Sequence, residues 1–218
     1  MMKSLLYKEF RLAKHQTMYM FLFFGAMLLI PNYPYYVAFF YTCLAVFFVF
    51  LTGRENKDVY YTVCQPVRKR DIVRARCTMV AIFQLASLLL AVPFAVLSVR
   101  INPNAAGNMV GIEPNVAFFG LVLVMFALFN AIFFPIFYKD AVSVGRAFLW
   151  SSIALFLYII LAEALLYILP DAKAYLDTAE ASAQLRQLPV LLAGMLVYAL
   201  AMVVVYRRSA ALFEKVDL

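Results

Sequence analysis

The sequence predicts an all-helical membrane protein with six transmembrane helices and both termini in the cytoplasm. Three observations support this fold class. Of the 218 residues, 66% are hydrophobic and only 14% are charged, whereas a soluble domain is about half apolar and a quarter charged. Six apolar stretches each approach the roughly 20 residues that a helix needs to cross a bilayer. The basic residues are concentrated between alternate stretches, as in proteins oriented by their positive charges.

The predicted spans follow one another through short connections. They are residues 14–30, 35–52, 79–99, 116–138, 147–169 and 188–206. Helices are expected because backbone groups in lipid must form hydrogen bonds within their own segment. The Pro-Asn-Tyr-Pro sequence at 31–34 and the polar segment 102–114 contain turn-forming residues, and we expect them to be loops outside the membrane. Six spans in one domain, residues 1–218, leave no room for a separate soluble domain.

The positions of lysine and arginine predict the orientation. With both ends inside, the inner segments hold 16 of the 19 basic residues, and the outer loops hold only Arg100, Lys173 and Arg186. Such an excess is typical of cytoplasmic loops. The formal net charge of +7 therefore indicates membrane orientation rather than nucleic-acid binding.

Residues 1–13 predict an interfacial helix that lies on the inner leaflet. Met2, Leu5, Leu6 and Phe10 recur at helical spacing, and basic residues occupy the rest of the helix surface. Two interpretations remain open for this helix, a simple topological anchor or a contact with a partner protein.

The largest cytoplasmic feature is segment 53–76, which mixes acids, bases and apolar residues. We expect short helices at the membrane surface, interrupted at Pro66, with a helix that begins at Asp71 and runs into the third span. One interpretation is an anchor formed by its basic residues. The other is a docking surface for a soluble partner, to which Val59, Tyr60 and Tyr61 would contribute exposed apolar contacts.

Few polar residues fall inside the predicted spans. Glu163, about six residues from the outer end of the fifth span, is the only carboxylate and is a candidate functional group by default. Its alternative role is to reach the outer interface or a neighbouring helix. Asn130 and Gln84 complete a possible intramembrane polar site, although such residues more often join helices by hydrogen bonds. Segment 170–188 is too polar to span and predicts an external helix, or otherwise a loop.

The sequence predicts neither a catalytic site nor a metal site. Cys43, Cys64 and Cys77 match no disulfide or zinc spacing, and His15 is the only histidine. The phosphate-loop, HExxH and GxSxG patterns are absent from the sequence. We therefore expect no bound cofactor on this chain and no enzymatic activity of its own.

Two stretches resemble the permease subunits of type-2 ATP-binding-cassette (ABC-2) exporters. The opening LLYKEFRLAK is similar to the family's interfacial helix, and the stretch from Glu55 through QPVRKRDIVRAR to Arg76 is similar to its segment between the second and third helices. The resemblance implies a homodimer in a bacterial cytoplasmic membrane, joined to two ATPase subunits that hold ATP and Mg. It also implies that segment 53–76 couples to those subunits. The implied coupling residues are Glu55, Lys57, Asp58, Tyr60, Tyr61, Pro66, Val67, Arg68, Lys69 and Arg70.

The small size of the chain is most similar to the branch that exports phenol-soluble modulins, which are amphipathic peptides. Two rival functions are a membrane sensor or immunity protein against such peptides, which would not transport them, and an intramembrane enzyme that uses Glu163. The second rival lacks a partner residue for that carboxylate.

Overall fold

The computed structural model describes residues 2–13, 16–101, 108, 110–168, 173, 175–177 and 184–217. Within these ranges the chain is helical and has no β-strand, so the predicted all-helical class is confirmed. Five helices are long and apolar enough to cross a membrane. They are α3 (Tyr36–Glu55), α5 (Lys69–Ile101), α6 (Val116–Tyr138), α7 (Val144–Ile168) and α10 (Leu188–Glu214).

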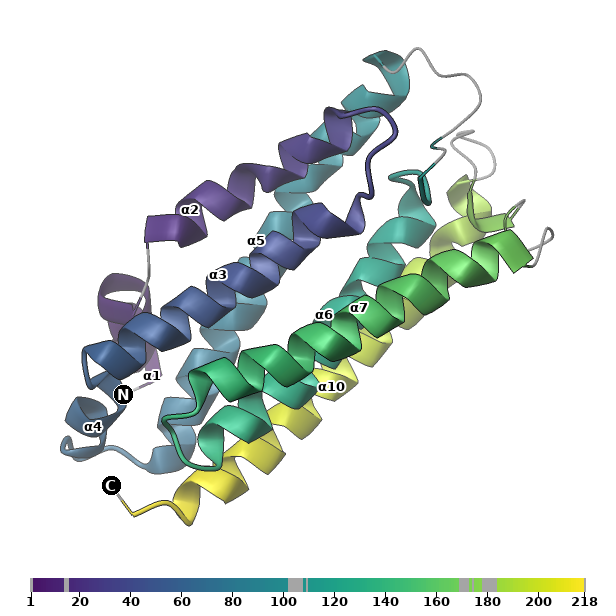
Figure 1. Ribbon diagram of the computed structural model, residues 1–218. Helices are drawn as coiled ribbons and strands as arrows, with labels where there is room; N and C mark the ends of the chain where they lie inside the picture. The colour runs from purple at the N-terminus through teal and green to yellow at the C-terminus, as the bar shows by residue number, and fades with distance from the viewer. Residues whose placement is uncertain are drawn as a thin grey trace.

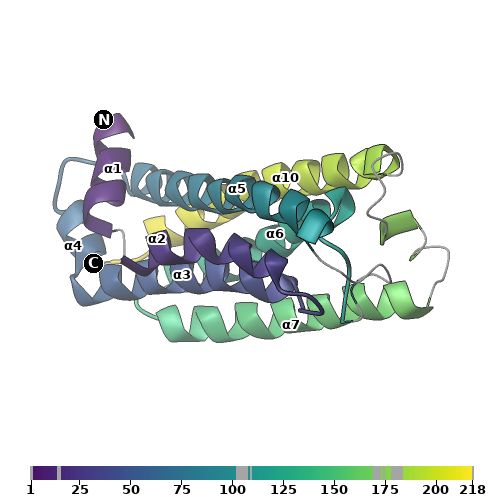
Figure 2. The same ribbon diagram turned by 90° about the horizontal axis from the view of Figure 1, so that it is seen from above.

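The long helices lie side by side in an elongated bundle, and both termini are found at the same end of it (Figure 1). The shorter apolar segment at residues 16–29 and the five long helices make six passes along the bundle, which brings the two termini to the same end. The N-terminal helix α1 (Met2–Lys8) continues into a short π-helix, η1 (Glu9–Ala13). In the second view α1 runs across the end of the bundle rather than along it (Figure 2). This is the orientation expected of a helix that lies in the membrane interface.

The first apolar segment lies within the predicted span 14–30. It consists of α2 (Gln16–Leu22) and a 3₁₀-helix, η2 (Phe23–Leu29), while residues 14 and 15 lie outside the described ranges. A 3₁₀-helix rises about 2.0 Å per residue against 1.5 Å for an α-helix, so the two pieces together extend about 25 Å. This length falls slightly short of a hydrocarbon core of about 30 Å.

Helix α6 is the centre of the bundle. Of its most apolar window, 61% is buried, against 11% for α7 and 17% for the helix that contains α10. Its aromatic side chains pack edge to face around Phe50 of α3, whose ring centroid lies 5.0 Å from that of Phe133 and 4.7 Å from that of Phe137. Such arrangements are favourable for aromatic rings. Helices α7 and α10 therefore present large apolar faces to their surroundings.

Helices α6 and α10 cross in close contact through two glycines. A Cβ atom on Gly120 would lie 2.7 Å from the carbonyl oxygen of Val190, and one on Gly194 would overlap the carbonyl oxygen of Gly120. Small residues allow such backbone contact between membrane helices, where dispersion forces replace the hydrophobic effect. The closest helix pair in the bundle thus depends on the absence of two side chains.

The loop between α6 and α7 is organised by Asp140. Its Oδ1 accepts hydrogen bonds from the backbone N–H groups of Val142 (3.0 Å) and Ser143 (2.9 Å), and Arg146 lies 3.1 Å from its Oδ2. Partial burial opposes ionisation of Asp140, but the hydrogen bonds from Ser143 and Val142 outweigh it and lower the pKa. The charged carboxylate therefore stabilises the start of α7.

Candidate functional site: the coupling segment and its charged network

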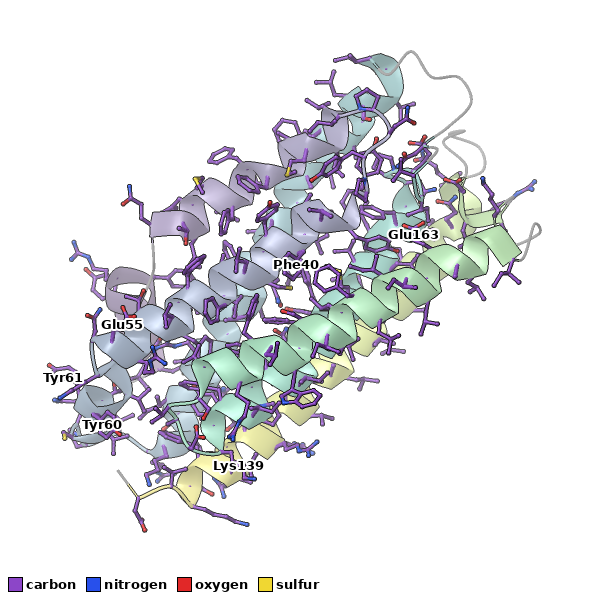
Figure 3. All side chains as sticks on the ribbon, in the orientation of Figure 1. Phe40, Glu55, Tyr60, Tyr61, Lys139 and Glu163 are labelled. Atoms are coloured by element: carbon purple, nitrogen blue, oxygen red, sulfur yellow. The ribbon has the colours of Figure 1, made fainter. Side chains whose placement is uncertain are left out.

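Segment 53–76, which we call the coupling segment after the role that the resemblance implies, contains a short helix at the end of the bundle that carries the termini. Helix α4 (Asp58–Val63) follows a turn in which Lys57 has a φ of 51°. Tyr60 and Tyr61 are 43% and 63% exposed and point away from the bundle (Figure 3). Val59, which we expected to be exposed, is buried because it packs on the bundle side of α4. The exposed apolar surface of this segment is therefore formed mainly by the two tyrosines.

Behind α4 lies a closed network of four charged side chains. Arg76 of α5 pairs with Glu9 of η1 and, at 2.5 Å, with Asp58 of α4. Lys8 of α1 lies 2.6 Å from Asp58 and 3.2 Å from Glu9, so each cation contacts both carboxylates. The side chains are only 1% to 14% exposed. The network is neutral overall, as burial of charges requires.

This charged network joins three segments that are far apart in the sequence. It connects α1 and η1 to α4 and to the first turns of α5. Thr62 adds a third contact on α4 to the two ion pairs of Asp58, because its hydroxyl accepts a hydrogen bond from Lys8 at 2.7 Å. The Arg76 guanidinium also lies over the ring of Phe50, 5.2 Å from the centroid. The charged network therefore attaches α4 to α1 and to α5.

The basic residues next to the coupling segment have separate partners. Lys69 Nζ donates to the carbonyl oxygen of Val216 at 2.5 Å, and Arg70 binds Glu214 with two nitrogen atoms. These contacts attach the start of α5, which begins at Lys69 rather than at the predicted Asp71, to the end of α10. Among Arg68, Lys69 and Arg70, only the Arg68 side chain has no hydrogen bond or ion pair to another described residue.

Two of the three predicted intramembrane polar residues contact each other. The side chain of Asn130 donates to Gln84 Oε1 at 2.8 Å, and Gln84 Nε2 lies 3.2 Å from Asn130 Oδ1. Tyr198 of α10 donates its hydroxyl to the same Gln84 oxygen at 2.8 Å. All three side chains are buried. They form an interhelical hydrogen-bonded tie between α5, α6 and α10, the alternative role expected for such amides.

Glu163 lies apart from this tie, near the opposite end of the bundle from Tyr60 and Tyr61 (Figure 3). A Cβ atom on Gly111 would come within 2.8 Å of its Oε1. Among the described residues its Oε2 has no hydrogen-bond partner.

Asp177 is also at this end and accepts a hydrogen bond from the Glu113 backbone N–H at 2.9 Å. Burial raises the pKa of Glu113, and the nearby charge of Asp177 raises it further.

Sequence reasoning missed several residues of these clusters. Lys8 and Glu9 were treated only as part of an amphipathic helix, and Tyr198 as part of an apolar span. One signal was available, because Glu9 is the only acidic residue among the basic ones that precede the first span.

Within the described residues no group of histidine, cysteine and carboxylate side chains is arranged to hold a metal ion. The three cysteines are free. Most of the predicted external segment 170–188 lies outside the described residues.

Two hollows are relevant to binding. A groove of about 440 Å³ opens between α5, α6 and α10 in the half of the bundle away from the termini, and its walls are almost entirely apolar. A second hollow of about 400 Å³ lies between Ser4 and Leu5 of α1 and Tyr61, Pro66 and Val67 of the coupling segment. The first suits an apolar molecule, and the second is accessible to a protein partner at the end of the bundle.

Comparison with known protein families matches residues 4–214 to the family described as "ABC-2 family transporter protein". No curated protein and no solved structure matches the chain. The family match extends from α1 to the end of α10 and so includes the coupling segment, the charged network and all five long helices. A family of this kind acts together with an ABC ATPase. The chain therefore belongs to the ABC-2 transporter family, as a membrane-spanning permease component of an ABC transporter.

Proposed function

We propose that the chain is the permease subunit of an ATP-driven exporter that moves amphipathic or hydrophobic peptides, similar to phenol-soluble modulins, out across the bacterial cytoplasmic membrane. Two copies pair with each other and with two ATPase subunits in this proposal. Family membership supports the transport role, whereas the peptide cargo, the direction and the stoichiometry are proposals.

The observation that carries the proposal is the attachment of α4 to the rest of the protein. Helix α4 presents Tyr60 and Tyr61 outward, and its opposite side is held by Asp58 in the charged network. A surface for a soluble partner is thus connected to helices that enter the membrane. Nucleotide-driven closure of the ATPase pair would move α4 and, through Arg76, would tilt α5. Alternating access requires two positions of such a packed element, so α5 would have a second position in this mechanism.

The apolar groove supports the choice of cargo. Its lining is formed by residues such as Leu88, Phe119 and Met195, and no charged residue lines it. An amphipathic helix could place its apolar side there and keep its polar side toward a neighbouring protein surface. Methionine and aromatic side chains adapt to different apolar shapes, which suits a group of related peptides rather than one ligand.

The coupling role is tested with the chain and its copurifying ATPase in lipid vesicles. Tyr61→Ala is expected to abolish most peptide-stimulated ATP hydrolysis while basal hydrolysis and membrane insertion persist. Tyr175→Ala is the matched control, because Tyr175 is 44% exposed but its backbone carbonyl accepts a hydrogen bond from Gln187 at the start of α10, away from α4. Equal stimulation in both variants would remove α4 from the coupling path. A chain that purifies without any ATPase would favour the sensor or immunity function.

The cargo is tested in the same vesicles by comparing an amphipathic helical peptide with a scrambled peptide of identical composition. Only the amphipathic peptide is expected to stimulate hydrolysis and to accumulate on the far side. In Leu88→Trp the groove is partly filled, so the peptide concentration for half-maximal stimulation should rise. Equal rates of ATP hydrolysis with the two peptides would contradict the peptide cargo and would leave the transporter assignment intact.

A further inference from the structure

The seam between α5 and α10 contains another groove in the half of the bundle that carries the termini. Its volume is about 400 Å³, and it is separate from the large groove except that both include Leu85. The two helices lie side by side (Figure 2). The tie of Gln84 to Tyr198 holds them together near the level where the two grooves meet. The seam is therefore open on either side of this tie.

The groove is polar at one end and apolar along the rest. Arg74, Thr78 and Tyr206 lie at the end near the termini, and Ile82, Leu85 and Val203 form the deeper walls. Apolar walls alone are normal on a surface that faces lipid. A cation and two hydroxyl groups at the membrane-surface end, next to these walls, match the shape of one lipid molecule, with a charged head and an apolar chain.

Arg74 differs from its neighbours on the same helix. Arg70 pairs with Glu214, and Arg76 pairs with Glu9 and Asp58. Among the described residues, no carboxylate lies within salt-bridge distance of Arg74, whose side chain is exposed. The positive charge in the groove is therefore available to an anion from outside the protein.

We propose that this groove, which we call the α5–α10 lipid site, binds one anionic phospholipid from the leaflet on the side of the termini. Arg74 and the hydroxyl of Tyr206 donate hydrogen bonds to the phosphate, and one acyl chain lies along Ile82, Leu85 and Val203. Basic pockets between membrane helices on the cytoplasmic side are known to hold anionic head groups. The site is distinct from the proposed cargo groove, with which it shares only Leu85.

The experiment uses the full chain and its single tryptophan, Trp150, which is first replaced by phenylalanine. A reporter is then introduced into the groove as Ile82→Trp. Its fluorescence is measured in vesicles of phosphatidylcholine mixed with phosphatidylglycerol, with bromine on the chains of one lipid or the other. Bromine quenches only tryptophans that it touches. Ile153→Trp on α7 is the control, because Ile153 is similarly exposed, at 50% against 44% for Ile82, but does not line the groove.

Brominated phosphatidylglycerol is expected to compete for the reporter at position 82 about fivefold better than brominated phosphatidylcholine, the usual effect of one basic side chain at an anionic surface. The control at 153 should show no preference. Arg74→Gln should remove the preference, and Arg208→Gln, an exposed arginine outside the groove, should retain it. A reporter at Val203→Trp, on the other wall, should behave as position 82 does.

Three outcomes would overturn the proposal. The first is equal quenching by the two lipids at positions 82 and 203. The second is a preference for phosphatidylglycerol that survives Arg74→Gln. The third is a reporter that neither lipid quenches although position 153 is quenched, since a second copy of the chain or another protein would then cover the groove.

Discussion

Removal of Arg76 provides the most direct test of the charged network. The Arg76 side chain is 5% exposed and pairs with Glu9, which is 1% exposed, and with Asp58, which is 11% exposed. In Arg76→Gln the network keeps two carboxylates and only Lys8 as a cation, so one buried negative charge is uncompensated. Loss of one partner of a buried ion pair costs about 3–5 kcal/mol. We expect a loss of this size in the free energy of unfolding.

The loss is measured by equilibrium unfolding in mixed micelles, followed by circular dichroism. Arg70→Gln is the matched control, because Arg70 is on the same helix but its pair with Glu214 is exposed and should contribute nothing measurable. The double variant Glu9→Gln, Arg76→Gln should recover about 0.5–3 kcal/mol, since it removes both charges. If Arg76→Gln and Arg70→Gln were equally stable, or the double variant lost the sum of the single losses, the network would not be the buried, mutually dependent unit described above.

The remaining predictions concern packing, pH and the intramembrane tie. Gly194→Ala should destabilise the α6–α10 contact by about 1–3 kcal/mol, measured by the same unfolding assay, while Gly145→Ala, where no atom lies within 4 Å of the added carbon, should not. Because the folded pKa of Asp140 is lowered from 3.8, its contribution to stability should be complete above that value and lost as the pH falls through the folded pKa. The difference in melting temperature between wild type and Asp140→Asn should therefore disappear in acid, and a difference that persisted there would contradict this role. Gln84→Leu should lower the free energy of unfolding by about 1–2 kcal/mol, and the double variant with Asn130→Leu should lower it by little more. If the losses of the two single variants added up in the double variant, the two side chains would not share one tie.

Much of the bundle could be predicted because membrane spans are determined by long apolar runs. The predicted span 116–138 coincides with α6, since the polar cap Asn115 and the turn at Lys139 limit it on both sides. The 3₁₀ winding of residues 23–29 in the first apolar segment could not be predicted. This winding places Gly25 so close to Ala91 of α5 that an added Cβ would lie 2.8 Å from the Ala91 side chain. Such contacts depend on how two helices pack, which is not visible in either helix alone.

Only part of the candidate site could be predicted, because local residue patterns do not reveal contacts between distant segments. The coupling segment was recognised from a local pattern of residues, and Tyr60 and Tyr61 are exposed as expected. The charged network requires Glu9 to meet Arg76, and hydropathy and local spacing carry no information about that long-range contact. The burial of Val59 follows from the same contact, because the ion pairs of Asp58 hold α4 against the bundle.

Helix α5 contributes one residue to each of three polar features: the charged network, the α5–α10 lipid site and the intramembrane tie. Arg76 joins α5 to the coupling segment, Arg74 lines the lipid site on the opposite side of the helix, and Gln84 ties α5 to α6 and α10. A buried charge network adds little stability over apolar packing, but it holds its members in one arrangement. If a movement of α4 tilted α5, it would therefore change both the shape of the lipid site and the geometry of the hydrogen bonds that Gln84 makes. Lipid bound at Arg74 would favour one position of α5 only if its affinity differed between the two positions. The coupling assay in vesicles with and without phosphatidylglycerol distinguishes these cases, because a lipid that binds both positions equally would leave stimulated hydrolysis unchanged in wild type and in Arg74→Gln.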